Sequence, residues 1–135
     1  MAVRALQRLG YILGEAHYAD AARDVLQLYA GVMGGRPAGL ATLLTALQEY
    51  VTPLRLLVLR GEQAQLMSWH KALREIHAAD VVCLALPAGL AKLPRALDKP
   101  VDDAPVAWLC QGTQCLPAIH DAHKLCEMLR ARQDV

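Results

Sequence analysis

A chain of 135 residues that is 55% apolar and 20% charged is long enough to bury a core and too apolar to be a disordered segment. Its 14 basic and 13 acidic residues are interspersed and leave a formal charge of +1, so we expect no nucleic-acid partner. The longest uncharged apolar stretches, residues 37–47 and 81–91, are too short to cross a bilayer, and no secretory signal opens the chain, so we expect no membrane partner and a cytoplasmic location.

Residues 1–50 form the helical part of what we interpret as a single domain, residues 1–135. Apolar residues recur there at three- and four-residue spacing, which predicts helices over residues 1–14, 18–33 and 38–50. Gly14 suits the end of the first helix, and Pro53 disfavours a helical conformation in the residue before it. The expected inward residues are Val3, Leu6, Leu9, Leu13, Tyr18, Ala22, Val25, Leu26, Tyr29, Met33, Leu40, Leu43, Leu44 and Leu47.

Residues 51–135 alternate short apolar runs with helical patterns. Apolar runs bounded by Gly, Pro or Asp predict buried strands. We expect strands at residues 55–59, 81–86, 105–110 and 116–119, a crossover helix at 62–77, and a last helix at 121–132. A strand, a helix and a strand in that order predict a βαβ unit, because parallel strands need a long crossover. The predicted fold class is therefore α/β: N-terminal helices, a small mixed sheet built on a βαβ unit, and a C-terminal covering helix.

Gly61 lies between the first strand and the crossover helix, where phosphate-binding loops occur. The residues around it contain neither G-x-G-x-x-G nor Gly-Lys-Ser/Thr, so we interpret Gly61 as an ordinary turn residue. We expect Arg60 and Glu62 beside it to be solvated. The sequence predicts no cofactor.

Cys110 and Cys115 are the redox candidates. Four residues separate them, and if the third strand turns back there, their Cα atoms lie about 4.5–5.5 Å apart across an antiparallel pair. That spacing is within disulfide range. The alternative is a pair of thiols packed as small hydrophobes, which is the expectation for cysteines in the cytoplasm. The spacing is not the C-x-x-C of thioredoxin-like enzymes.

His120, His123 and Cys126 are spaced by three residues near one helix face, and all three are zinc-type ligands. No second ligand pair follows at finger-like spacing, so we expect exposed histidines at a helix start and no metal. His70 and His77 share a face of the crossover helix. No nucleophile or orienting carboxylate matches them, so the sequence predicts no catalytic residue.

The segment Ala107-Trp-Leu-Cys110-Gln-Gly-Thr-Gln-Cys115-Leu-Pro117, followed by Asp121 and a helix, resembles the end of a known family. The family is the thioredoxin-domain-containing proteins related to spermatogenesis-associated protein 20 and bacterial YyaL. Residues 13–18, 53–61 and 100–102 are similar to further motifs of that family, so the resemblance covers nearly the whole chain. Full-length relatives add a thioredoxin-like domain and an (α/α)6 toroid of the six-hairpin glycosidase type. The resemblance implies that residues 1–50 are like the last toroid helices and that residues 51–135 are an α/β appendage.

The resemblance implies a non-catalytic C-terminal structural or interaction domain, because the thioredoxin-like domain and most of the toroid lie outside this chain. The alternative function is a thiol redox module that uses Cys110 and Cys115. A third is a small-molecule site at the carboxyl ends of the first two strands. The leucine-rich helices exceed what a small sheet covers, so we expect residues 1–50 to bind the remainder of a parent protein or to form a homodimer.

Overall fold

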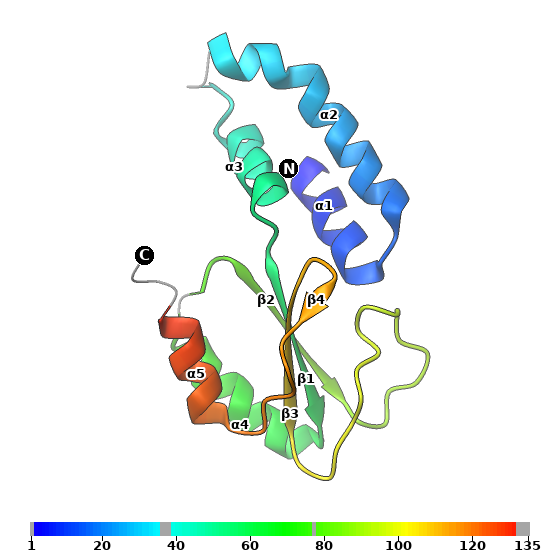
Figure 1. Ribbon diagram of the computed structural model, residues 1–135, viewed down its shortest axis with the longest axis vertical. Helices are drawn as coiled ribbons and strands as arrows, with labels where there is room; N and C mark the ends of the chain where they lie inside the picture. The colour runs from blue at the N-terminus through cyan, green and yellow to red at the C-terminus, as the bar shows by residue number, and fades with distance from the viewer. Residues whose placement is uncertain (1, 36–38, 77, 132–135) are drawn as a thin grey trace. The chain divides into compact units, whose positions relative to one another are not determined.

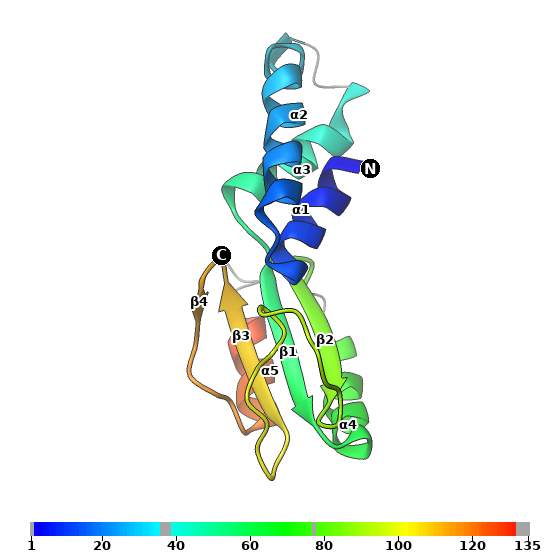
Figure 2. The same cartoon turned by 90° about the vertical axis from the view of Figure 1, so that its right-hand side faces the viewer.

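The computed structural model describes residues 2–35, 39–76 and 78–131 (Figures 1 and 2). The chain divides into two compact units, Met1–Pro53 with Pro94–Leu97, and Leu54–Leu93 with Asp98–Val135. The predicted element ends at residues 1, 38, 77 and 132 lie outside the described residues. Within those ranges, no helix combines the length and the apolar character needed to cross a membrane.

The helical unit contains α1 (Ala2–Leu13), α2 (Ala16–Gly35) and α3 (Ala41–Val51). The connection between α1 and α2 is shorter than predicted because Gly14 adopts a φ of 72° and the Glu15 N–H donates to the Gly10 carbonyl at 3.1 Å. Gly10 also lets the two helices approach closely, since a Cβ there would lie 3.1 Å from the Ala19 nitrogen. The shared core consists of Val3, Ala22, Leu26, Met33 and Ala46.

Two of the predicted inward residues of this unit are wrong: Leu9 and Tyr29 are each 41% exposed. The reason is that three helices around a small core bury only a narrow stripe of each helix. Residues at the margin of a predicted apolar face then remain at the surface. Periodicity locates the centre of such a face better than its width.

Glu49 of α3 ties α3 to α1 in the same unit. Its Oε1 accepts hydrogen bonds from Arg4 Nε at 3.0 Å and from Arg8 Nη2 at 3.1 Å. Burial acts to raise the pKa of the Glu49 carboxyl, but the hydrogen bonds and charges of Arg4 and Arg8 outweigh it and lower the pKa. The carboxylate is therefore the favoured form of Glu49 in the folded protein.

The second unit has an α/β fold built on the predicted βαβ unit. β1 (Arg55–Gly61) and β2 (Val81–Pro87) pair in parallel and are joined by α4 (Gln63–Arg74). β3 (Val106–Gln111) pairs antiparallel with β1, and β4 (Gln114–Cys115) with β3, so the strand order is β2-β1-β3-β4. The predicted mixed sheet and C-terminal helix, α5 (Ala122–Arg130), are confirmed.

α4 and α5 lie together on one face of the sheet (Figure 2). Side chains alternate along each strand, so Leu57 and Leu59 of β1 and Leu109 of β3 point into this layer. The predicted stripe of the crossover helix meets them there: Leu66, Trp69 and Leu73 of α4 are buried, and so is Ile76, although α4 ends at Arg74 rather than at residue 77. α5 begins as predicted at Asp121, whose side chain accepts hydrogen bonds from the main-chain N–H groups of residues 123 and 124.

Three details of the second unit correct the prediction. β1 continues two residues further than predicted, which makes Arg60 a central-strand residue that is only 3% exposed rather than solvated. Gly61 has a φ of 154°, and a Cβ there would lie 3.1 Å from the Cα of Pro105, so close packing requires this glycine. The return strand is Gln114–Cys115 rather than residues 116–119, of which Ile119 alone bridges to β3.

Candidate redox site

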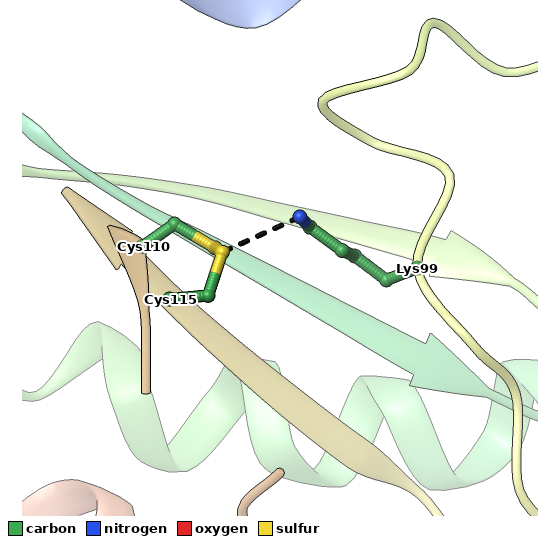
Figure 3. Close-up of a disulfide and its surroundings, with 3 residues drawn as sticks. All are labelled: Lys99, Cys110 and Cys115. Atoms are coloured by element: carbon green, nitrogen blue, oxygen red, sulfur yellow. Dashed lines mark hydrogen bonds between the residues drawn. A yellow bond between two sulfur atoms is a disulfide. The ribbon is translucent and has the colours of Figure 1, made fainter. Parts of the chain in front are cut away.

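Cys110 of β3 and Cys115 of β4 are joined by a disulfide across the hairpin (Figure 3). The two residues pair directly in the antiparallel register, and their Cα atoms are 3.9 Å apart, closer than the expected separation of about 4.5–5.5 Å. A two-residue turn connects the strands, and its first residue, Gly112, has a φ of 58°, which the primed turns of tight hairpins require. Of the two alternatives left open by the sequence, the bonded pair is the one present in the structure.

Main-chain hydrogen bonds hold the hairpin independently of the sulfur atoms. The Leu116 N–H donates to the Leu109 carbonyl at 2.9 Å, directly beside the cysteine pair. Further along, Ala107 and Ile119 exchange two hydrogen bonds of 2.8 and 3.0 Å. The return segment is thus attached to β3 by contacts that do not need the disulfide.

The two cysteines lie in different environments. Cys110 is only 4% exposed because β3 lies between β1 and β4, whereas Cys115 lies on the outermost strand and is exposed. The Nζ of Lys99 is 3.4 Å from the Sγ of Cys115 and donates to it (Figure 3). Lys99 reaches the pair from the irregular segment that passes over the face of the sheet opposite α4 (Figure 3).

The segment that carries Lys99 is attached to the sheet next to the disulfide. The indole Nε1 of Trp108 donates to the Pro100 carbonyl at 3.2 Å. Trp108 and Cys110 are two residues apart on β3 and therefore share a face of the sheet. The contact sets Pro100, and with it the neighbouring Lys99, above the face on which the disulfide lies.

Sequence reasoning missed Lys99, because it lies 16 residues from Cys115 in a segment with no periodic pattern. It also missed a second feature near the hairpin, the ion pair between Arg55 and Asp80, with Nε–Oδ2 2.7 Å and Nη2–Oδ1 3.1 Å. A signal for that pair existed: in a parallel βαβ unit, the residue before the second strand lies beside the start of the first.

A cleft of about 480 Å³ lies at the hairpin's end of the sheet. Its lining combines apolar side chains, two amides and one charged side chain. These are Leu109, Cys115, Leu116, Met128, Ala131, Gln111, Gln114 and Arg55. Leu109 and Gln111 alternate with Cys110 along β3, so their side chains are on the face opposite the disulfide. The charged residue of this lining, Arg55, is already paired with Asp80.

The other cysteines are free thiols in poor positions for exchange. Cys83 is partly buried, and desolvation by burial raises the pKa of its thiol to about 11, so it is protonated at neutral pH. Cys126 is buried in the core under α5. Thiol chemistry therefore concentrates at the Cys110–Cys115 pair.

The predicted metal ligands are not brought together. Cys126 points into the core, His123 is exposed beside Glu127, and His120 lies 3.9 Å from Asp102. In the ranges that the structure describes, no group of three or more His, Cys, Asp or Glu residues could hold a metal ion.

A small cleft lies near the carboxyl ends of β1 and β2, which the sequence proposes as a small-molecule site. A cleft of about 170 Å³ next to β2 is lined by Gln63, Leu66, Met67, His70 and Ala85. Ligand pockets usually measure about 300–1,000 Å³. His70 is exposed there, and His77 lies outside the described residues.

No family model, curated protein or solved structure matches this chain. The resemblance to the family of spermatogenesis-associated protein 20 therefore stays a prediction. Of the residues that the sequence singled out, the structure joins Cys110 and Cys115 and adds Lys99 beside them.

Proposed function

We propose that the β3–β4 hairpin is a reversible dithiol–disulfide site and that the chain acts as a thiol redox module. The observation that carries this proposal is the pairing of an exposed cysteine, Cys115, with a buried one, Cys110, on a hairpin that has its own hydrogen bonds. Exchange needs an accessible sulfur, and reversibility needs a fold that survives reduction. The exposed position of Cys115 and the hydrogen bonds of the hairpin support these two conditions.

A purely structural role for the disulfide is less consistent with its position. The two cysteines are five residues apart, so the bond closes a very short loop. In the chain-entropy model such a loop gives about 2 kcal/mol, well below what a long loop gives. The sheet beside it already has a buried central strand and a covering helical layer. The bond therefore contributes modestly to stability while remaining accessible to exchange.

Repeated reduction and reoxidation of the purified chain tests this proposal. After each cycle, peptide mapping should find one disulfide between Cys110 and Cys115, free thiols at Cys83 and Cys126, and an unchanged circular dichroism spectrum. The Cys110→Ala/Cys115→Ala variant is the control and should take up no oxidising equivalents. Scrambled disulfides or progressive precipitation after the first cycle would contradict a reversible site.

We propose the cytoplasm as the compartment in which this cycle runs. Glutathione and thioredoxin systems there exchange with accessible disulfides. A pair with an exposed sulfur on an edge strand is open to those small thiols. Trapping the thiols by acid quench of intact cells, with and without an added oxidant, should show the pair in both states.

A second proposed function, protein interaction, rests on the helical unit. α2 carries an apolar stripe beyond the one it buries: Leu28 is 75% exposed, Val32 is 51% exposed, and Tyr29 lies between them. A separate cleft of about 420 Å³ between α2 and α3, on another side of α2, is lined in part by Leu26, Met33, Leu44, Leu47 and Tyr50. Neighbouring exposed apolar side chains on one helix are typical of an interface.

We propose that a second copy of this chain covers that surface in a symmetric homodimer. In a longer parent protein of the resembled family, the remaining toroid helices would cover it instead. Light scattering coupled to size exclusion at micromolar concentration should give a dimer mass. Leu28→Glu/Val32→Glu should give a monomer, whereas Met67→Glu, an equally exposed change on α4, should not. A monomer mass for the unchanged chain would refute self-association.

A further inference from the structure

We infer that Cys115 is the sulfur at which exchange enters, that Lys99 stabilises the Cys115 thiolate, and that Cys110 is the resolving sulfur. The co-reactant is a disulfide from solution when the pair is reduced, and a thiol when it is oxidised. This inference rests on the proposed redox function and assigns each residue of the site a distinct role.

The two cysteines differ in their exposure to solvent. In thiol–disulfide exchange the attacking thiolate approaches the sulfur under attack along the line of the breaking bond, so that sulfur must be open to solvent. Cys115 lies on β4, at the outer edge of the sheet, and is exposed. Cys110 is flanked by β1 and β4 and is buried. A reagent from solution therefore meets Cys115 first.

Charge favours the same sulfur. The Lys99 ammonium lies 3.4 Å from the Cys115 Sγ, and a cation at that distance stabilises a thiolate over a thiol. Two acidic side chains of this unit face other partners: Asp80 pairs with Arg55, and Asp102 lies 3.9 Å from His120. Lys99 contacts the disulfide at Cys115, and the Trp108–Pro100 hydrogen bond helps to hold its segment in place.

Oxidation of the reduced pair takes place in two exchange steps. The Cys115 thiolate attacks one sulfur of the external disulfide, forming a mixed disulfide and releasing one external thiolate. Cys110 then loses its proton to solvent and attacks the Cys115 Sγ, which forms the Cys110–Cys115 bond and releases the second external thiolate. The protein dithiol is oxidised by two electrons, and the external disulfide is reduced by two. The reverse sequence reduces the protein.

The β3–β4 hairpin suits this two-step exchange. Directly opposed cysteines on paired strands place the resolving sulfur next to the mixed disulfide without any rearrangement of the main chain. The Leu116–Leu109 hydrogen bond holds β4 against β3 while the sulfur–sulfur bond is broken. Resolution should therefore be fast compared with entry, and little mixed disulfide should accumulate.

Single-cysteine variants test the assignment of the two sulfurs. In reduced Cys110→Ser, Cys115 should react with iodoacetamide at pH 7 about tenfold or more faster than Cys110 does in reduced Cys115→Ser. Peptide mapping separates these signals from Cys83 and Cys126. With oxidised glutathione, Cys110→Ser should form a stable mixed disulfide at Cys115, while Cys115→Ser should form little. Equal rates in the two variants would overturn the assignment.

The role of Lys99 is tested in the Cys110→Ser background by Lys99→Met, Lys99→Arg and the exposed control Lys71→Met. Lys99→Met should slow alkylation of Cys115 at pH 7 about two- to fivefold, as expected for loss of one partly exposed cation, and should move the pH midpoint of alkylation upward. Lys99→Arg should restore both values, and Lys71→Met should change neither. An unchanged pH midpoint in Lys99→Met would show that Lys99 does not act on the thiolate.

These results are distinguishable from failure of the redox proposal itself. If the pair does not cycle reversibly but Cys115 is still the faster sulfur and responds to Lys99, the assignment of roles stands and the redox function falls. If the pair cycles but the two sulfurs react alike, the redox function stands and the assignment falls.

Discussion

Reduction of the Cys110–Cys115 bond is the perturbation that most clearly distinguishes a redox site from a structural disulfide. The bond spans a sequence separation of five. Loop-closure entropy for a loop of that length corresponds to about 2 kcal/mol at 25 °C. For a unit of about 80 residues, a loss of that size lowers the melting temperature by about 10 °C. We therefore expect the reduced protein to be less stable and still folded.

Tryptophan fluorescence measures this effect in the correct part of the molecule. Both tryptophans of the chain, Trp69 and Trp108, belong to the α/β unit, and the helical unit has none. Urea unfolding followed at the two tryptophans, with and without a phosphine reductant, gives the difference in free energy of unfolding. The control is the Cys110→Ala/Cys115→Ala variant, in which the reductant should have no effect.

The reduced protein should keep a cooperative transition, because the Leu116–Leu109 and Ala107–Ile119 hydrogen bonds remain. Loss of that transition on reduction would show that the hairpin depends on the disulfide. The site would then be a structural bond, and the argument for reversibility would fail.

Three further predictions concern the α/β unit. Leu57→Asp should abolish its cooperative unfolding, because a buried unpaired carboxylate in a central strand costs several kcal/mol. Met67→Asp, at an exposed site of α4, is the control and should unfold cooperatively. A normal melt in Leu57→Asp would contradict the central position of β1. Asp80→Ala should lower the free energy of unfolding by about 1.5–3 kcal/mol, because it removes the carboxylate that pairs with the buried Arg55 guanidinium. Asp80→Asn should lower it by less. Equal and negligible losses of unfolding free energy in urea melts would show that the ion pair does not contribute to stability. Because burial raises the pKa of Cys83 to about 11, its alkylation should stay slow at pH 8. The stability of the fold should fall as pH rises above about 8.5, the pKa of a cysteine thiol in an unfolded chain. Rapid alkylation at pH 8 would show that the thiol is exposed.

The βαβ unit could be predicted because its signals are dense and local. Residues 55–59 are nearly all apolar, and the stripe of Leu66, Trp69, Leu73 and Ile76 has a clear helical period. Both features survive in the structure, where β1 is buried along its length and the stripe packs on it. Local pattern and tertiary packing favour the same structure at these residues.

The errors occur where local signals are weak or are overridden by position. Arg60 was expected in solvent because it is charged, but its place in the central strand keeps it buried. β4 has two residues, too few for an alternation of apolar and polar residues to be visible. Lys99 reaches the disulfide through a contact distant in sequence. Two of the three residues of the candidate site, the cysteine pair, could be predicted from turn spacing, and the cation beside them could not.

The reduction potential of the Cys110–Cys115 pair tests the central claim most directly. The protein is equilibrated with glutathione buffers of defined ratio, quenched with acid, and scored by the mass shift of alkylated Cys110 and Cys115. We predict a potential between about −200 and −300 mV, where the cellular thiol pools can both open and close the bond. A potential below about −300 mV would mean that the glutathione pool cannot reduce the bond, and the redox function would be wrong.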